Sequence, residues 1–454
     1  MITFLICLVA LVISYFTYGK YLEKKCDINP SNPVPSKTMY DGVDYLPLPR
    51  WKVFLIQLLN IAGLGPIFGA LLGAAYGPVA FLWITLGGIF MGAMHDYIAG
   101  VISLKNNGVS LPEIIGKYLG NNTKIFMRVF TVLLMVLVGA VFTSQPAALI
   151  TSNISLPALE GTAIGTMSWE TIIVFSIITI YYMLATMLPI DKIIGRMYPL
   201  FGMALLIMAF GILVVLLTDS DTYIIPELTS IDNQITNPEK FPIMPMLFTT
   251  IACGAISGFH ATQSPLMARC MNNERESRVV FYGAMISESI IALIWAAIGM
   301  AFFHGPDSLA VALAEHGNNA AWAVNTISNT TLGIAGGLLA MLGVVAAPIT
   351  SGDTAFRSAR LIVADILHIE QRTIAKRLLI SLPLFAIGGM LLFIDFDIIW
   401  RYFAWTNQAL ASVVLWCIVV YLYREKANYW VALIPAVFMT YICSSFVFVS
   451  NQFV

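Results

Sequence analysis

The sequence predicts an all-α polytopic membrane protein with about 12 transmembrane helices. Of the 454 residues, 59% are apolar and only 11% are charged, which is too little charge to cover a soluble surface of that size. The apolar residues form separate runs of about 17 to 28 residues, the length that a bilayer requires. Two of these runs are interrupted near their middle by small and polar residues.

The predicted spans follow one another along the whole chain. They cover residues 2–18, 51–76, 78–104, 124–151, 168–188, 197–217, 242–271, 279–303, 329–358, 376–394, 398–423 and 428–449. The run at 2–18 lacks a cationic start and a small-residue cleavage site, so we expect a retained helix and not a signal peptide.

Lysine and arginine residues predict the orientation of the spans. In the twelve-span scheme, all but two of the 24 Lys and Arg residues fall on one side, and the exceptions are Lys240 and Arg401. Loops rich in these residues face the cytoplasm. The scheme therefore predicts a multi-pass membrane protein with both termini outside.

The two interrupted runs break at residues 60–66 and 256–260. Gly63 and Gly65 lack side chains and Pro66 lacks an N–H, so the helix cannot satisfy all its backbone groups there. Five spans separate the starts of the two broken runs, which gives the second set of five an inverted topology. We expect an extra helix and a Pro-rich loop at 1–50, repeats at 51–217 and 242–423, and a second extra helix at 428–454. This topology resembles the LeuT-type architecture.

Paired breaks of this kind indicate a binding site in the middle of the membrane. Freed N–H groups at the start of a half-helix can hold a carboxylate. The alternative is a proline kink or close packing through small residues. The residues predicted to bind substrate are Asn60, Gly63, Leu64, Gly65, Gln145, Ser257, Gly258, His260, Gln263 and Asn407.

Several of these polar residues have a second interpretation. His260 can donate to a carboxylate, titrate during transport, or bond a neighbouring carbonyl in a structural role. Gln145 and Asn407 can line a pathway or tie helices together. We expect no transition metal, because His95, Asp96 and His260 lack the spacing of a known metal motif.

Two kinds of cation site are predicted for the coupling ion. For a sodium-like ion, the oxygen ligands would be those of Leu59, Ala62, Ala347, Thr350 and Ser351. The alternative there is that the hydroxyls bond carbonyls of the preceding helical turn. For a proton, the candidates are Asp96 and Glu288, which lie well inside the membrane in this scheme, and Asp353, which lies nearer the inner boundary. Asp353 can instead pair with Arg357 four residues later.

Several stretches together resemble the carbon starvation protein A family of peptide and pyruvate transporters, in a short form. They are Asn60-Ile-Ala-Gly-Leu-Gly-Pro66, Gly92-Ala-Met-His-Asp96, Ile256-Ser-Gly-Phe-His260, Asn273-Glu274, Tyr282-Gly-Ala-Met285 with Glu288, Thr350-Ser-Gly-Asp-Thr354 with Arg357 and Arg360, and Asn407-Gln408. The resemblance implies an importer of peptides or small carboxylates in the cytoplasmic membrane, driven by an ion gradient.

The sequence therefore predicts a secondary active transporter for a peptide, an amino acid or pyruvate, coupled to Na⁺ or H⁺. We expect no enzyme, no other cofactor and no nucleic-acid partner, since a basic cluster is missing. The partners are the substrate and the lipid bilayer, and the oligomeric state is left open. The alternatives are a channel or a membrane nutrient sensor, although a channel would show a wide polar stripe or a ring of like charges.

Overall fold

The computed structural model describes residues 1–153, 163–164, 167–190, 194–394 and 396–450. Within these residues the protein is helical apart from strands β1 (Ala163–Ile164) and β2 (Met167–Ser168), which pair antiparallel. The α-helices are α1 (Ile2–Phe16), α2 (Tyr18–Lys25), α3 (Pro35–Thr38), α4 (Arg50–Ala62), α5 (Ala70–Ala74), α6 (Val79–Leu82), α7 (Ala93–Lys105), α8 (Leu111–Leu119), α9 (Asn121–Asn153), α10 (Trp169–Met187), α11 (Ile194–Thr218), α12 (Phe248–Thr250), α13 (Gly258–Ala268), α14 (Ala284–Phe302), α15 (Pro306–Glu315), α16 (Ala320–Ala340), α17 (Ala346–Leu367), α18 (Ile374–Leu391), α19 (Phe396–Arg424) and α20 (Trp430–Val449).

Wider π-helical turns join several of these helices into longer spans. They are η1 (Gly65–Gly69), η2 (Trp83–Gly92), η4 (Ile243–Leu247), η6 (Arg278–Gly283) and η7 (Met341–Val345), and η5 (Glu274–Glu276) is a 3₁₀ turn. π-Turns inside α-helices often occur at functional sites.

The predicted multi-pass helical protein is confirmed at the level of its spans. Among the described residues, nine helices are long and apolar enough to cross a membrane, and two bent pairs bring the number to 11. This is one fewer than the sequence predicted. The run at 242–271 is the exception, because it consists of the short pieces η4, α12 and α13. Its non-helical stretch is residues 251–257, which begins five residues earlier than the predicted break at 256–260.

The run predicted at 329–358 also differs. It begins at α16 and continues through η7 into α17, which ends at Leu367. Asp353, which the sequence placed nearer the inner boundary than Asp96 and Glu288, lies about four helical turns before the end of α17. The hydropathy of the sequence ended this span too early. The buried arginines of α17 look in the sequence like the charged residues that usually mark a membrane boundary.

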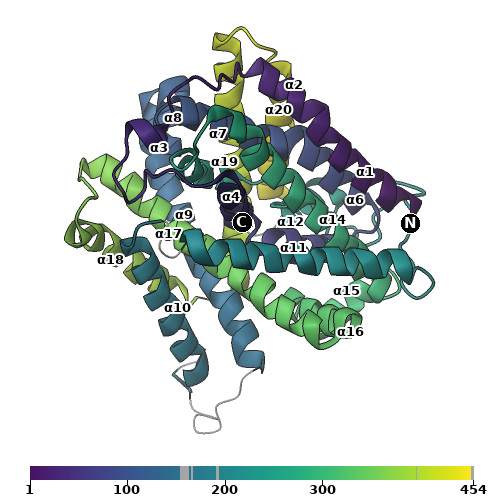
Figure 1. Cartoon of the computed structure of the whole chain (residues 1–454). Helices are drawn as coiled ribbons and strands as arrows, with labels where there is room; N and C mark the ends of the chain where they lie inside the picture. The colour runs from purple at the N-terminus through teal and green to yellow at the C-terminus, as the bar shows by residue number, and fades with distance from the viewer. Residues whose placement is uncertain (154–162, 165–166, 191–193, 395, 451–454) are drawn as a thin grey trace.

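The first broken helix occupies the middle of the molecule. α4 appears almost end-on there in Figure 1, and it packs against α11, α13, α14 and α17. Its residues from Leu55 to Ala62 are all buried. The two halves of both broken runs therefore meet in the core and not at the surface.

The outer helices present apolar side chains to the surroundings. In the apolar part of α10 only 28% of residues are buried, against 83% for the span Glu274–Phe302. Ile177 and Leu184 of α10 are more than half exposed. Such broad apolar surfaces are typical of a protein surrounded by hydrocarbon, so the protein is a multi-pass membrane protein.

Candidate functional site

The first break is a true interruption with no space for larger residues. α4 ends at Ala62, Gly63 adopts a φ of +46°, and the following half-helix is bent by 54°. A Cβ on Gly65 would lie only 2.1 Å from the Cβ of Cys253. Because Cys253 belongs to the non-helical stretch 251–257, the two breaks lie directly against each other.

Side chains of neighbouring helices satisfy backbone groups at the second break. Trp83 Nε1 donates to the carbonyl of Ile251 at 2.8 Å, and Gln408 Nε2 donates to the carbonyl of Phe248 at 3.1 Å. Unpaired backbone groups are costly inside a membrane. These two side chains therefore help to stabilise the non-helical conformation of the chain at the second break.

The side chain of Asn407, on α19, lies against the start of the half-helix α13. Its Oδ1 accepts from the backbone N–H of Phe259 at 2.7 Å, and its Nδ2 donates to Ser257 Oγ at 2.9 Å. A Cβ on Gly258 would lie 2.4 Å from the backbone oxygen of Asn407. The structure thus brings together Ser257, Gly258 and Asn407, but an amide oxygen fills the position predicted for a substrate carboxylate.

Ionisable side chains from three helices form a completely buried chain beside the breaks. His95 Nδ1 lies 2.8 Å from Asp96 Oδ1 on α7, and Asp96 Oδ2 lies 2.8 Å from Nδ1 of His260 on α13. The other ring nitrogen of His260 faces Glu288 of α14 at 3.6 Å. All four side chains have no exposed surface.

Glu288 and the two histidines of this chain have unmet bonding capacity, and His95 Nε2 lacks a hydrogen-bond partner among the described residues. Neither oxygen of Glu288 has a hydrogen-bond partner among the described residues, and the same holds for His260 Nε2. A buried carboxylate in this condition is costly, so Glu288 can hold a proton or contact a cation. The sequence predicted Asp96 and Glu288 as separate proton candidates, whereas the structure joins them through His260.

Three donors in this region lie close enough to hold a metal ion. The ligand atoms of Cys253, His260 and Glu288 all lie within 4.8 Å of one another. The histidine would keep its Nδ1 bond to Asp96, which is the usual arrangement for a metal-bound imidazole. The expected absence of a transition metal stays a prediction that a metal analysis can test.

Oxygen atoms of the predicted sodium-like site converge where α17 meets α4. Ser351 Oγ lies 2.8 Å from the carbonyl of Leu59 and 3.2 Å from the carbonyl of Ala347. Thr350 Oγ1 donates to the same Ala347 carbonyl at 2.6 Å. These contacts agree with both interpretations of this motif. The two hydroxyls bond within their own helix, as the structural interpretation expects, and Ser351 also contacts the broken helix, as the cation site would require. Ala62 is buried at the end of α4.

The remaining predicted substrate residues differ in their surroundings. Asn60 is buried and its amide group has no partner among the described residues. Gln263 donates to Thr262 Oγ1 at 2.9 Å, and its Oε1 has none. Leu64 is buried, whereas Gln145 on α9 is half-buried.

Asp353 does not form the pair with Arg357 that the spacing allowed. Tyr198 of α11 donates to Asp353 Oδ2 at 2.7 Å, and Asp353 Oδ1 has no partner among the described residues. Arg357 instead contacts Asp44 at 2.8 Å. Tyr198 and Asp44 were not predicted from the sequence, because their partners lie more than 150 residues away.

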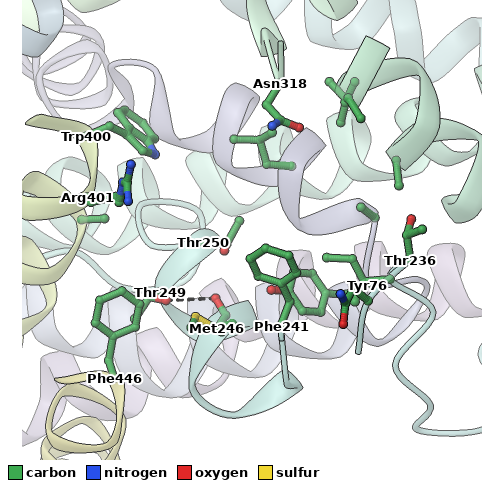
Figure 2. A pocket seen from close by; sticks show the side chains of 18 residues that line it. Tyr76, Thr236, Phe241, Met246, Thr249, Thr250, Asn318, Trp400, Arg401 and Phe446 are labelled. Carbon is green, nitrogen blue, oxygen red and sulfur yellow. Dashed lines mark hydrogen bonds between the residues drawn. The ribbon is translucent and has the colours of Figure 1, made fainter. Parts of the chain in front are cut away.

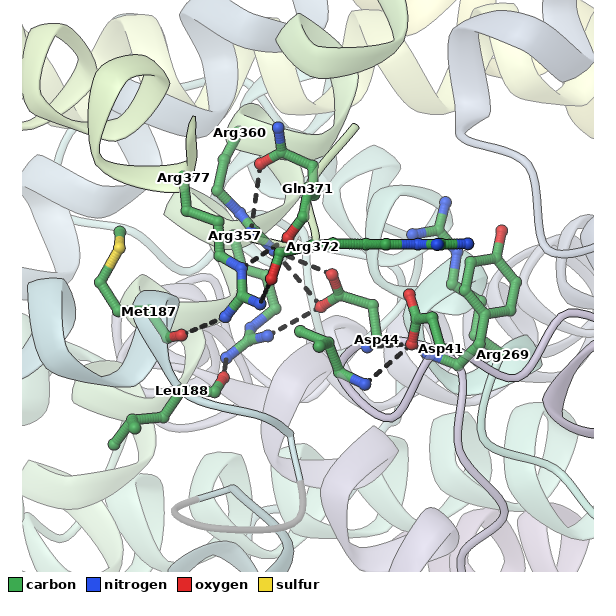
Figure 3. A network of polar contacts seen from close by, with 12 residues as sticks. Asp41, Asp44, Met187, Leu188, Arg269, Arg357, Arg360, Gln371, Arg372 and Arg377 are labelled. Atoms are coloured by element: carbon green, nitrogen blue, oxygen red, sulfur yellow. Dashed lines mark hydrogen bonds and ion pairs between the residues drawn. The ribbon is translucent and has the colours of Figure 1, made fainter. Parts of the chain in front are cut away.

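A group of buried arginines surrounds Asp44, as Figure 3 shows. Arg357 and Arg360 of α17 both bind its carboxylate, at 2.8 and 3.1 Å. Arg377 of α18 donates to the carbonyl of Met187 at the end of α10. Burial alone would raise the pKa of Asp44, but the charges of Arg360, Arg357 and Arg269 outweigh it and hold that pKa well below its usual range. We call Asp44, Arg357, Arg360 and Arg377 the arginine cluster.

A pocket of about 460 Å³ lies where the end of the first broken run meets the beginning of the second. Figure 2 shows its side chains. It contains none of the predicted substrate residues. We call it the outer pocket. Its lining residues are Leu72, Ala75, Tyr76, Ile235, Thr236, Asn237, Phe241, Met246, Thr249, Thr250, Ala310, Leu313, Ala314, Asn318, Trp400, Arg401, Ala404 and Phe446.

Comparison with known proteins decides the family. The model of the carbon starvation protein CstA family matches residues 1–156, 147–342 and 305–445. The chain belongs to the CstA family. The matched segments include both breaks and every residue of the buried ionisable chain, so the site described above lies within the part that the family shares.

Relatives within the CstA family include proteins with named activities. An uncharacterized membrane protein of Haemophilus influenzae is 44% identical over 68% of this chain and 93% of its own length. The peptide transporter CstA of Campylobacter jejuni is 27% identical over 62% of this chain and 47% of its own length. The pyruvate/proton symporter BtsT of Escherichia coli is 27% identical over 62% of this chain and 46% of its own length.

This chain thus aligns with about half the length of the named CstA-family transporters. Their names support a membrane transporter with a peptide or small-molecule substrate, and they make a non-enzyme plausible.

Proposed function

We propose that this protein is a secondary active transporter that imports peptides or small carboxylates across the cytoplasmic membrane, coupled to a proton gradient. The observation that carries the proposal is His260, whose ring lies between Asp96 and Glu288 beside two helix breaks that touch each other. Buried ionisable residues within a membrane typically mark ion pathways and proton relays. The name of the proton symporter BtsT, a relative, supports the same ion.

A sodium ion at Leu59, Ala347 and Ser351 is the second possibility for the coupling ion. Oxygen ligands suit such a hard cation. However, Ser351 Oγ and the Leu59 carbonyl lie at hydrogen-bond distance, 2.8 Å, so a sodium ion would have to replace that bond. The carboxyl of Glu288 needs no such rearrangement to accept a proton. For this reason we favour the proton.

The substrate carboxylate is proposed to bind between the breaks, near Gly63 to Gly65 and at the start of α13. There it would take over the N–H of Phe259, which now donates to Asn407 at 2.7 Å. The positive end of the α13 dipole favours an anion at this point. Backbone groups that bind the carboxylate do not distinguish between substrate side chains, which suits a transporter for varied peptides.

Transport is proposed to follow from a LeuT-like fold with inverted repeats at 51–217 and 242–423, in which one helix bundle rocks against the rest of the protein around the fixed site. In the predicted orientation, with both termini outside, the arginine cluster closes the inner side and the outer pocket opens to the outside. Movement of α17 away from Asp44 would then open the inner path.

Uptake into proteoliposomes tests this function. We expect labelled dipeptide or pyruvate to accumulate when the outside is made acidic, and Glu288→Gln to abolish accumulation because it cannot take up a proton. Glu425→Gln, at an exposed position, serves as the matched control and should retain uptake.

Two outcomes would overturn parts of this account. Accumulation that needs a sodium gradient, ignores the pH gradient and is lost in Ser351→Ala would replace the proton by sodium. Uptake that persists without either gradient would exclude ion coupling altogether.

A further inference from the structure

The second break brings together two residues that a continuous helix would keep apart. Cys253 lies in the non-helical stretch 251–257, and His260 lies in the first turn of α13. Seven residues of regular α-helix would separate them by about 10 Å along the axis, which is too far for both to contact one ion. In the structure, the ligand atoms of Cys253, His260 and Glu288 all lie within 4.8 Å of one another. We call these three residues the three-donor cluster.

The atoms of the three-donor cluster have bonding capacity left for a ligand. His260 Nε2 lies 3.6 Å from Glu288 Oε2, which is longer than a normal hydrogen bond. Neither this nitrogen nor either oxygen of Glu288 has a hydrogen-bond partner in the described part of the chain. Two ligand atoms of one tetrahedral zinc ion, each about 2.1 Å from the metal, lie about 3.4 Å apart. The spacing of this pair therefore fits a shared ion better than a direct hydrogen bond.

The residues behind His260 hold its ring in the orientation that a metal ligand needs. Its Nδ1 lies 2.8 Å from Asp96 Oδ2, and Asp96 Oδ1 lies 2.8 Å from Nδ1 of His95. A metal-bound imidazole usually donates its second N–H to a carboxylate, which fixes the tautomer. With the proton on Nδ1, the lone pair of Nε2 is directed toward Glu288 and is free to bind a metal.

The chemistry of the three donors selects the class of ion. A thiolate, an imidazole and a carboxylate are the ligands of zinc sites, and three protein ligands leave a fourth position for water. Magnesium and calcium prefer oxygen ligands alone. When zinc binds, Cys253 gives up its thiol proton and Glu288 gives up any proton that it carries, and both protons pass to the solution. No redox step is involved, because zinc does not change its oxidation state.

We propose that Cys253, His260 and Glu288 form a zinc-binding site whose occupation blocks transport. Zinc bound to Glu288 would exclude a proton from it and would tie the second break to α14. The block rests on the proposed transport function, whereas the binding of zinc does not. The inference departs from the expectation of no transition metal. That expectation considered His95 and Asp96 with His260, and the structure brings a different set of donors together.

Metal binding to the purified full chain tests the site. The protein is washed with a chelator in detergent and titrated with Zn²⁺ against a zinc-binding dye, and Co²⁺ serves as a spectroscopic probe. We expect one tightly bound ion for each chain and a thiolate-to-cobalt charge-transfer absorption. Cys253→Ser should remove this absorption, whereas Cys443→Ser, at another buried cysteine, should keep it. Asp96→Asn should weaken zinc binding at least about tenfold, because it removes the partner of the ligating histidine.

Two results would overturn the site. One is a wild-type protein that binds neither ion at one equivalent or gives no charge-transfer absorption with Co²⁺. This measurement does not depend on the folding of any variant. The other is a charge-transfer absorption that persists in Cys253→Ser, since the thiolate would then belong to another cysteine.

Uptake in proteoliposomes of the full chain tests the block. Zinc should abolish uptake of labelled dipeptide by the wild type and by Cys443→Ser, and a chelator should restore it. Cys253→Ser, compared with its own uptake in the absence of zinc, should need at least about tenfold more zinc for the same inhibition. Full uptake by a wild type saturated with zinc would overturn the block. Missing uptake by the wild type without zinc would instead contradict the transport function, and the binding measurement would still decide the site.

Discussion

At the scale of single residues, Asp44 has the clearest electrostatic role. It lies in a Pro-rich loop, yet only 3% of its side chain is exposed, between Arg357 and Arg360. The guanidinium charges keep its pKa in the folded protein below the unfolded value of about 3.9. Its contribution to stability is therefore fully present above about pH 4 and is lost as the pH falls further.

Asp44→Asn is expected to lower the unfolding temperature clearly at pH 7, since removing one partner of a buried ion pair costs about 3 to 5 kcal/mol. The difference from the wild type should shrink below about pH 4. Thermal unfolding in detergent between pH 3 and 8 measures this. Asp27→Asn, an exposed position with the same change, is the control, and equal unfolding temperatures of wild type and Asp44→Asn at pH 7 would refute the role of Asp44.

At the scale of elements, the contact between the two breaks organises the core. Gly65 and Cys253 are so close that even one methyl group has no space, with 2.1 Å between the added Cβ and the Cβ of Cys253. By contrast, a Cβ on Gly202 of α11 would meet its nearest neighbour, Leu55, at 3.4 Å. The two glycines thus offer a matched comparison of a crowded site with one where an added methyl group would make ordinary contacts.

Gly65→Ala should destabilise the protein by about 1 to 3 kcal/mol through overpacking, and Gly202→Ala should cost much less. Adding Cys253→Gly to Gly65→Ala should restore part of the loss, because it removes the clashing side chain. Unfolding temperatures and dipeptide binding of the three variants check this. If Gly65→Ala were as stable and as active as Gly202→Ala, the breaks would not be in contact.

The elements also show what the sequence alone can and cannot predict. Apolar runs of bilayer length predicted eleven of the spans, because the bilayer fixes helix length. The second break was misplaced, since residues 251–256 are as apolar as those of a membrane-spanning helix. Tertiary contacts from Trp83 and Gln408 stabilise the non-helical conformation there, and the sequence does not reveal them. The individual residues Asp96, His260 and Glu288 were predicted, but their association was not. The outer pocket was missed because its lining comes from segments that are far apart in the chain.

At the scale of the whole molecule, the two ends of the predicted pathway differ in character. The arginine cluster joins the Pro-rich loop to α10, α17 and α18 by buried ionic and carbonyl contacts. The outer pocket instead leaves space beside both broken helices. Between them lie the breaks and the buried chain from His95 to Glu288. Under the proposed function, the arginine cluster would be the closed end of this pathway and the outer pocket its open end.

Proton movement driven by substrate tests the central claim most directly. Proteoliposomes that contain a pH-sensitive dye receive dipeptide or pyruvate on the outside, with no ion gradient imposed. We predict that the interior becomes acidic with wild type and with Glu425→Gln, and that it does not with Glu288→Gln. Entry of labelled substrate into wild-type vesicles with no change of internal pH would contradict proton-coupled transport.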